Sequence, residues 1–260
     1  MLNRFVAVLF FLVIILTGNL SLTQSVWAET FVQSNAENRL MLALSVGQAE
    51  LQKWLPAPWQ VSPPPKGPLK GANLFLVFMD WLLIQDPQGK PDQGGNGRFL
   101  ALAVPAKNMQ TGEMSTVIIR GFGVNTHDLP GAYKNAVLAT ILREQKHEGA
   151  NQEAGVVDDS WEIRDARGGM IELRVQYQRA LLSRGKQELK LYSAVEPNFF
   201  RIYRVDAAAD IVKSVPTGIN RVQKYQIRMT VPELSHLFDG TEQLVGVIVY
   251  PLYLRQVFLP

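Results

Sequence analysis

The chain has 260 residues, with 26 Lys and Arg against 23 Asp and Glu, 47% hydrophobic residues and no cysteine. This composition is that of an ordinary globular protein of one or two domains, and it excludes disordered, collagen-like and disulfide-stapled classes. The formal net charge of +3 is too small to indicate nucleic-acid binding. Without cysteine, the chain can form neither a thiol nucleophile nor a thiolate metal site nor an iron–sulfur cluster.

The first 28 residues have the pattern of a secretory signal peptide. Asn3 and Arg4 precede an apolar run at residues 5–16, and a polar stretch then ends in Val26-Trp27-Ala28. An apolar run of that length is short of the roughly 20 residues that span a bilayer. We therefore expect cleavage before Glu29, no stable membrane span afterwards, and an exported protein that is periplasmic or secreted.

A helix is predicted after the start of the mature chain. Ser34-Asn35-Ala36-Glu37 has the spacing of a capping box, and apolar residues between Leu40 and Leu55 recur at helical spacing. Pro56 ends this pattern because proline cannot continue a helix. The proline-rich residues 61–71 then predict a stiff, extended connector.

From Asn73 onward, short apolar and β-branched runs bounded by turn residues predict strands. A turn at Ser183-Arg184-Gly185 predicts that the runs on either side of it pair with each other. Alternation at 199–204 places Arg201 and Tyr203 on a solvated face, opposite Phe200. The predicted strands are residues 74–84, 99–104, 116–122, 171–178, 188–195, 199–205, 222–230 and 244–250.

Two helices are predicted among these strands, one at residues 133–147 and a short one from Pro232, since proline is favoured in a first helical turn. Many short strands with few helices indicate an α+β fold: a mostly antiparallel, closed or strongly curled β-barrel with a few packed helices. No composition change marks a second domain, so residues 29–260 are expected to form a single domain.

Cofactor and metal motifs are missing from the sequence. His127, His147 and His236 have no partner at ligand spacing, so no metal site is expected. There is neither a G-x-S-x-G nucleophile motif nor a phosphate-binding glycine pattern. We therefore predict no cofactor.

A polar cluster ends the predicted helix at residues 133–147. Arg143, Glu144 and Lys146 follow an apolar stripe that includes Tyr133. These residues are candidates for a binding or catalytic site. The alternative is structural, because cations are also favoured at a helix C-terminus by the helix dipole.

The segment Asp128-Leu129-Pro130-Gly131-Ala132-Tyr133, followed by an Ala-rich stretch and Arg143-Glu144, resembles the stretch leading into the active site of acetoacetate decarboxylase-like proteins. Leu55-Pro56, the strand beginning near Asn73 and the closing Tyr253-Leu254-Arg255 fit the same pattern. The resemblance spans most of the mature chain. It implies a closed antiparallel barrel with a few helices.

The family's decarboxylases place a Pro-Lys-Lys element shortly after Arg-Glu, and a lysine forms a Schiff base with the substrate ketone. In this chain Gln145-Lys146-His147 follows Arg143-Glu144, and no Pro-Lys-Lys is present. We therefore expect no decarboxylation through an imine.

The preferred hypothesis is an exported β-barrel protein that binds a small organic molecule, either a carboxylate, a carbonyl compound or an apolar ligand. Its predicted binding residues are Arg143, Glu144, Tyr133 and Arg120, with Arg120 as a basic partner for Glu144. An alternative is a lyase or decarboxylase-like enzyme acting on a small oxo acid, in which Glu144 is the acid or base and Lys146 the amine. A structural or interaction protein of the cell envelope is the third hypothesis. No nucleic-acid partner is expected, and the oligomeric state stays open.

Overall fold

The computed structural model describes residues 29–92, 96–124, 131–149 and 155–260. The predicted signal peptide at residues 1–28 lies outside the described residues. So do Asp128-Leu129-Pro130, which form the first half of the motif before Tyr133, and His127.

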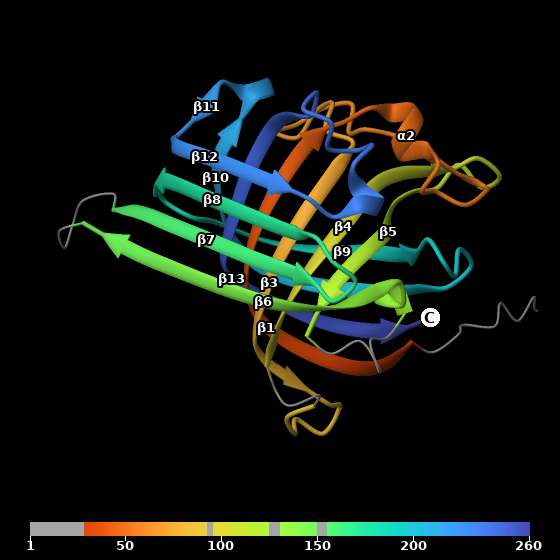
Figure 1. Ribbon diagram of the computed structural model, residues 1–260. Helices are drawn as coiled ribbons and strands as arrows, with labels where there is room; N and C mark the ends of the chain where they lie inside the picture. Colours follow the sequence, from red (N-terminus) through yellow and green to blue (C-terminus); the bar gives the residue numbers. More distant parts are fainter. Residues whose placement is uncertain (1–28, 93–95, 125–130, 150–154) are drawn as a thin grey trace, which may run out of the picture.

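Strands make up most of the described chain (Figure 1). They are β1 (Thr30–Ser45), β2 (Trp59–Val61), β3 (Leu74–Gln85), β4 (Gly97–Asn108), β5 (Met114–Gly123), β6 (Ala136–Glu148), β7 (Val156–Asp165), β8 (Met170–Gln178), β9 (Ser183–Ser193), β10 (Phe200–Ser214), β11 (Ile219–Asn220), β12 (Val222–Met229) and β13 (Gln243–Leu259). The helical elements are α2 (Gln48–Gln52) and the 3-10 turns η1 (Gly131–Tyr133), η2 (Val215–Thr217) and η3 (Pro232–Leu234).

The strands form one large mixed sheet in the order β12-β8-β7-β6-β5-β9-β10-β13-β1-β3-β4-β2. Most pairs are antiparallel, and β5 is parallel to both β6 and β9. Because β5 also pairs with β4, the pairings return to β5 through β9, β10, β13, β1, β3 and β4. Strands β6, β7, β8 and β12 form an arm that extends from β5 and crosses in front of the other strands (Figure 1).

The predicted fold class is wrong. The described chain is one large mixed sheet without a clear barrel, and it is not an α+β fold with several packed helices. The helix expected after Ser34 is strand β1, and α2 is the only helical part of that segment. Leu40, Leu42 and Leu44 are fully buried or nearly so at every second position, which is the period of a strand.

The helix predicted at residues 133–147 is also wrong, since η1 and β6 occupy the segment. Ile141 and Arg143 face inward, while Leu142 and Glu144, which alternate with them, are exposed. The apolar stripe at helical spacing therefore misled the assignment. β7 supplies a ten-residue antiparallel partner that satisfies the β6 backbone, and a local pattern cannot reveal such a partner.

The predicted strand positions are confirmed, but one predicted pairing is not. β8 pairs with β7 and β12, whereas β9 pairs with β10 and β5. Ser183-Arg184-Gly185 lies inside β9 rather than forming a hairpin turn. A turn-like tripeptide indicates only the local backbone preference of its own residues. β8 and β9 instead pair with other strands of the sheet.

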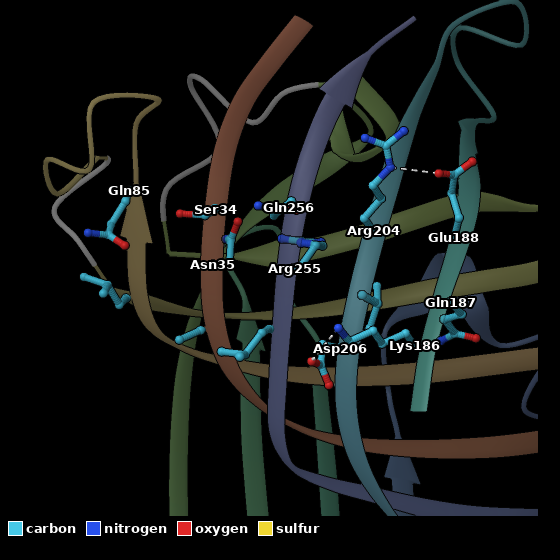
Figure 2. Close-up of a pocket in the computed structure, with 14 residues that line it drawn as sticks. Ser34, Asn35, Gln85, Lys186, Gln187, Glu188, Arg204, Asp206, Arg255 and Gln256 are labelled. Carbon is cyan, nitrogen blue, oxygen red and sulfur yellow. Dashed lines mark hydrogen bonds and ion pairs between the residues drawn. The ribbon is translucent and has the colours of Figure 1, made fainter. Parts of the chain in front are cut away.

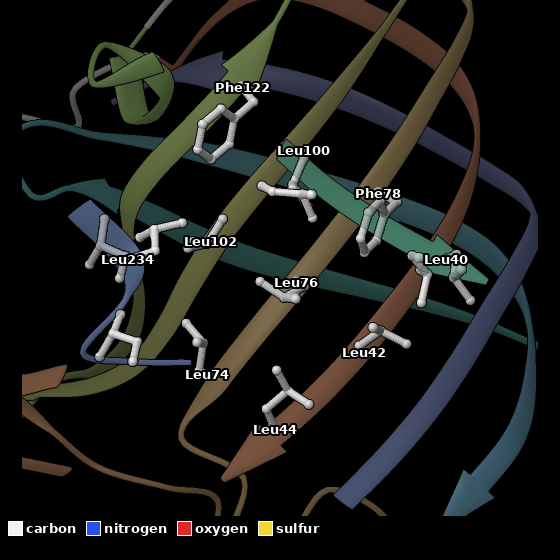
Figure 3. Packing of buried hydrophobic residues seen from close by; sticks show 14 of the residues in the cluster. Leu40, Leu42, Leu44, Leu74, Leu76, Phe78, Leu100, Leu102, Phe122 and Leu234 are labelled. Atoms are coloured by element: carbon white, nitrogen blue, oxygen red, sulfur yellow. The ribbon is translucent and has the colours of Figure 1, made fainter. Parts of the chain in front are cut away.

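The main core fills the space between the arm and one face of β1, β3, β4 and β5 (Figure 3). Leu40, Leu76, Phe78 and Leu100 are fully buried there. The ring of Phe78 contacts that of Trp161 on β7, with centroids 5.4 Å apart. This contact holds the arm against the rest of the sheet.

The opposite face of these strands carries a second, smaller set of buried residues. It has two apolar clusters, one around Met79, Phe99 and Tyr133 and the other around Tyr203 and Tyr253. β1 therefore presents a buried surface on both of its faces.

Replacing Phe78 by alanine is expected to lower the free energy of unfolding by about 3–5 kcal/mol, because it removes a fully buried ring and leaves a cavity. Leu82→Ala on the same strand is the matched control. Its side chain is 60% exposed, and a change within about 0.5 kcal/mol is expected. Urea denaturation of the three proteins measures both values, and equal losses would contradict the assigned core.

Candidate functional site

The structure places Glu144 and Lys146 on the exposed outer face of β6. They border a shallow hollow with polar neighbours that include Asp158 and Arg174. A hydrogen bond from Lys146 to Glu148, together with the charge of that carboxylate, raises the pKa of Lys146. This amine is therefore protonated at neutral pH and is a poor nucleophile. The binding and catalytic roles of Glu144 and Lys146 stay predictions.

Arg143 lies on the inner face of β6, where it ties the arm to the other strands. Its guanidinium donates to both carboxylate oxygens of Asp159, at 3.1 and 2.7 Å, and to Asp80 at 3.0 Å. It also donates to the Asn38 side chain on β1, at 2.8 Å. Two carboxylates compensate this buried charge, so the Arg143 cluster has the character of a structural ion-pair network.

Arg120 is held by a different set of partners from the one predicted. Its guanidinium donates to Glu233 at 2.8 Å and to the Asn135 carbonyl at 3.1 Å. No ion pair joins Arg120 to Glu144 in the described parts of the chain. Of the predicted site residues, Tyr133 is the one that lies in the second buried region.

That region has three charged residues at its centre. Glu37 and Arg39 project from β1, and Arg255 projects from β13 beside it. Glu37 Oε2 accepts a hydrogen bond from Arg39 Nε at 2.6 Å, and its Oε1 lies 3.1 Å from Arg255 Nη2. The three residues are 1%, 8% and 4% exposed, so this triad is almost completely removed from water.

Aromatic rings surround the triad. The Arg39 guanidinium carbon lies 3.6 Å from the centroid of the Tyr253 ring, and that of Arg255 lies 4.8 Å from the Tyr203 ring. Arg255 Nη1 donates to the Tyr133 hydroxyl at 3.3 Å. Cation–π contacts of this kind strengthen when water is excluded, so the rings help to hold the guanidinium groups in place.

Arg201 on β10 is a third arginine of this region, and the charge of Arg255 is among the interactions that perturb it. It is half-buried and has no carboxylate partner among the described residues. η1 packs directly against it, since a Cβ added to Gly131 would lie 2.9 Å from Arg201 Nε. The φ of Gly131 is +64°, which glycine adopts without strain, and the absence of a Cβ leaves room for the Arg201 side chain.

We call Glu37, Arg39, Arg201, Arg255 and Tyr133 the arginine cluster. Several of its buried polar atoms have no hydrogen-bond partner among the described residues: the donors Arg39 Nη2, Arg201 Nε and Arg255 Nε, and one acceptor, Glu37 Oε1, which lies in the ion pair with Arg255. Buried polar groups are nearly always paired in folded proteins, with protein, water or a ligand. The unpaired arginine N–H groups can therefore donate hydrogen bonds to an additional acceptor.

The electrostatics of the arginine cluster favour a negative charge. Burial acts to raise the pKa of Glu37, but the charges of Arg255 and Arg39 outweigh it, and the pKa lies below the ordinary value of 4.5. Burial also lowers the pKa of Arg201, and the neighbouring charge of Arg255 adds to this shift. Glu37 is therefore ionised at neutral pH, and its single carboxylate lies between two guanidinium groups, with that of Arg201 as a third in the same cluster.

A groove of about 890 Å³ runs along the other side of β1, β10 and β13 (Figure 2). Asn35, Val205 and Arg255 border both the groove and the second buried region, so the two meet at the same stretch of these strands. In contrast to the cluster, charges along the groove compensate one another. Arg204 pairs with Glu188 at 2.9 Å, as the dashed line in Figure 2 marks.

The residues of the arginine cluster were largely missed by sequence reasoning. Glu37 had been assigned to a capping box, and Arg201 and Tyr203 to a solvated face, although Tyr203 is only 2% exposed. Arg255 appeared only as part of the closing segment. The one usable signal was the alternation of Glu37 and Arg39 directly before a strongly apolar stretch, which indicates charges on a buried strand.

Within the described ranges, no group of three or more His, Cys, Asp or Glu side chains is arranged to hold a metal ion. In the same ranges no helix is both long and apolar enough to cross a membrane.

Comparison with known proteins identifies the fold. No protein-family model and no curated protein sequence matches the chain. An acetoacetate decarboxylase-like enzyme from Sphingomonas wittichii RW1 has a similar structure, with a TM-score of 0.56, 14% identity, and coverage of 87% of this chain and 90% of that one. The enduracididine biosynthesis enzyme MppR in complex with pyruvate is also similar, with a TM-score of 0.55, 10% identity, and coverage of 91% of both chains. The chain therefore has the acetoacetate decarboxylase-like fold, as the sequence resemblance implied.

Removing the charge of Glu37 is expected to destabilise the protein in a pH-dependent way. Because its pKa is lower in the folded state, ionised Glu37 contributes stability above about pH 4.5 and loses it as the pH falls further. Glu37→Gln should cost about 3–5 kcal/mol at pH 7, the usual cost of breaking a buried ion pair, and less near pH 3.

Denaturant unfolding at pH 7 and at pH 3 measures this difference. Glu144→Gln is the matched control, since that carboxylate is exposed, and it should have little effect at either pH. An equal loss for Glu37→Gln at both pH values would contradict a lowered pKa of Glu37 in the folded protein.

Proposed function

We propose that this protein binds a small organic carboxylate at the arginine cluster, without forming an imine with it. The observation that carries the proposal is the charge imbalance. The cluster has three arginines, Arg39, Arg201 and Arg255, but one carboxylate, Glu37, and each arginine retains a buried N–H group without a partner among the described residues. Carboxylates are the natural partners of guanidinium groups, since the planar fork of donors matches the two oxygens.

The surroundings favour binding of an anion over burial of the charges alone. Charges interact more strongly away from water, and an uncompensated buried charge is costly. A bound carboxylate would lower that cost and satisfy the unpaired donors. Arg201 is half-buried, so it is the arginine of the cluster that an incoming ligand can reach from solvent.

The similar structures support the ligand class. One structure of MppR is a complex with pyruvate, and another holds the condensation product of pyruvate and imidazole 4-carboxaldehyde. These ligands belong to MppR, which shares only 10% identity with this chain. They support a small carboxylate, with or without a neighbouring carbonyl group, as the first ligand class to test here.

The lysines support binding without imine chemistry. A lysine that forms a Schiff base needs a lowered pKa, which burial or a neighbouring cation provides. All eleven lysines of the sequence lie among the described residues; ten are exposed and Lys213 is intermediate. None contributes an amine to the arginine cluster, so the alternative of a decarboxylase-like lyase has no candidate lysine there.

The binding residues of this proposal overlap with the sequence-based set at one position. Tyr133 belongs to the arginine cluster through its contact with Arg255. Arg143 and Arg120 are engaged in separate ion pairs, and Glu144 lies on the outer face of β6. Roles for these three residues in ligand binding are independent predictions.

Replacing Arg201 by glutamine is expected to weaken carboxylate binding about tenfold or more, which is the effect of losing one charge-assisted hydrogen bond. Isothermal titration calorimetry with pyruvate and with acetoacetate measures the change. Arg204→Gln is the matched control, because Arg204 lies on the opposite face of β10 and pairs with Glu188.

The folding of both variants is checked by thermal melts. Unchanged affinity in Arg201→Gln, or equal losses in the two variants, would contradict a carboxylate site at the arginine cluster.

We also propose that the protein is exported to the periplasm or secreted, on the strength of the N-terminal apolar run and Val26-Trp27-Ala28. Protein purified from the exporting cell should have an intact mass that corresponds to a start at or near Glu29. Retention of the first 28 residues on a membrane-bound product would contradict both processing and export.

A further inference from the structure

We infer that the ligand of the arginine cluster carries two separate carboxylates, one bound by Arg201 and the other between Arg255 and Tyr133. This inference deepens the proposed function and rests on it. It concerns the class of ligand, a dicarboxylate as opposed to a monocarboxylate or a compact inorganic anion.

The charges of the arginine cluster do not balance. Glu37 bridges Arg39 and Arg255, at 2.6 and 3.1 Å, so the triad carries one net positive charge. Arg201 adds a second, which no carboxylate of the described residues compensates. Two unbalanced positive charges at a buried site favour two negative charges on the ligand.

The two unbalanced charges belong to residues on different strands, Arg201 on β10 and Arg255 on β13. Arg255 is paired in register with Val205, and Arg201 lies four residues earlier on the same strand, β10. Four residues correspond to roughly 13 Å along a strand, and adjacent strands add about 4.8 Å. The long side chains bring the two guanidinium groups closer than this backbone separation, since the charge of Arg255 acts on Arg201. Two arginines rooted on different strands can then each hold a separate carboxylate of a short ligand.

Hydrogen-bond donors are present at both proposed anchor points, Arg201 and the pair Arg255 and Tyr133. Arg201 Nε is buried without a partner beside η1. At the deeper point, Arg255 Nε and Arg39 Nη2 also have no partner in the described part of the chain. The Tyr133 hydroxyl, which accepts from Arg255, retains its own hydrogen to donate. Each point therefore has the donors that one carboxylate requires.

Calorimetric titration at pH 7 with succinate and with butyrate, which have the same number of carbons, tests the inference. Succinate should bind at least tenfold more tightly than butyrate. Tyr133→Phe removes a donor at the deeper point and should reduce the succinate-to-butyrate affinity ratio several-fold, whereas Arg201→Gln should weaken both ligands. Tyr225→Phe is the matched control, because Tyr225 packs against the main core on β12.

The outcomes separate this inference from the proposal beneath it. If succinate and butyrate bind equally and Arg201→Gln weakens both, the site binds one carboxylate and the inference is overturned while the proposed function stands. If inorganic phosphate binds as tightly as succinate, a compact dianion suffices and the two-point inference is overturned. If none of the three probes binds, the inference is overturned, and the proposed function falls as well only if pyruvate and acetoacetate also fail to bind. The wild-type affinity ratio decides the matter even if Tyr133→Phe fails to fold.

Discussion

The Glu37 carboxylate, held between Arg39 and Arg255, is the interaction on which the second buried region depends. It joins β1 to β13 through side chains, at a place where the two strands also share a ladder. Without this carboxylate, two guanidinium groups would face each other in an environment of tyrosine rings almost free of water. Arg255, held by Glu37, in turn donates to the Tyr133 hydroxyl and so links the triad to η1.

The chain contains two buried ionic networks of opposite character. Around Arg143, two carboxylates surround one guanidinium group and compensate its charge. This balance is typical of a structural ion-pair network, which here connects the arm to β1. Around Glu37 the balance is reversed, with arginines in excess and donors left unpaired. Both networks occupy interior space, so burial alone does not distinguish a structural network from a binding site. The two networks differ in their net charge and in whether their hydrogen-bonding groups are all paired.

Much of the strand content could be predicted from the sequence, since runs such as 74–84 and 116–122 combine β-branched and apolar residues between turn signals. The two long predicted helices failed because Leu40 to Leu55 and Tyr133 to His147 fit a period of 3.6 nearly as well as a period of two. Pairing partners far along the chain decided between them. The arginine cluster was beyond reach for the same reason: β1, β10, β13 and η1 meet only in the folded sheet.

The order of strands in the sheet has a consequence for association between molecules. Among the described strands, β12 lies at one end of that order and pairs with β8 alone, so one of its sides presents backbone N–H and C=O groups to which a strand of another chain can pair. Lys224 and Arg228 are exposed on this short strand. Two such edges brought together would place cations against cations, which opposes growth of the sheet from one molecule into the next.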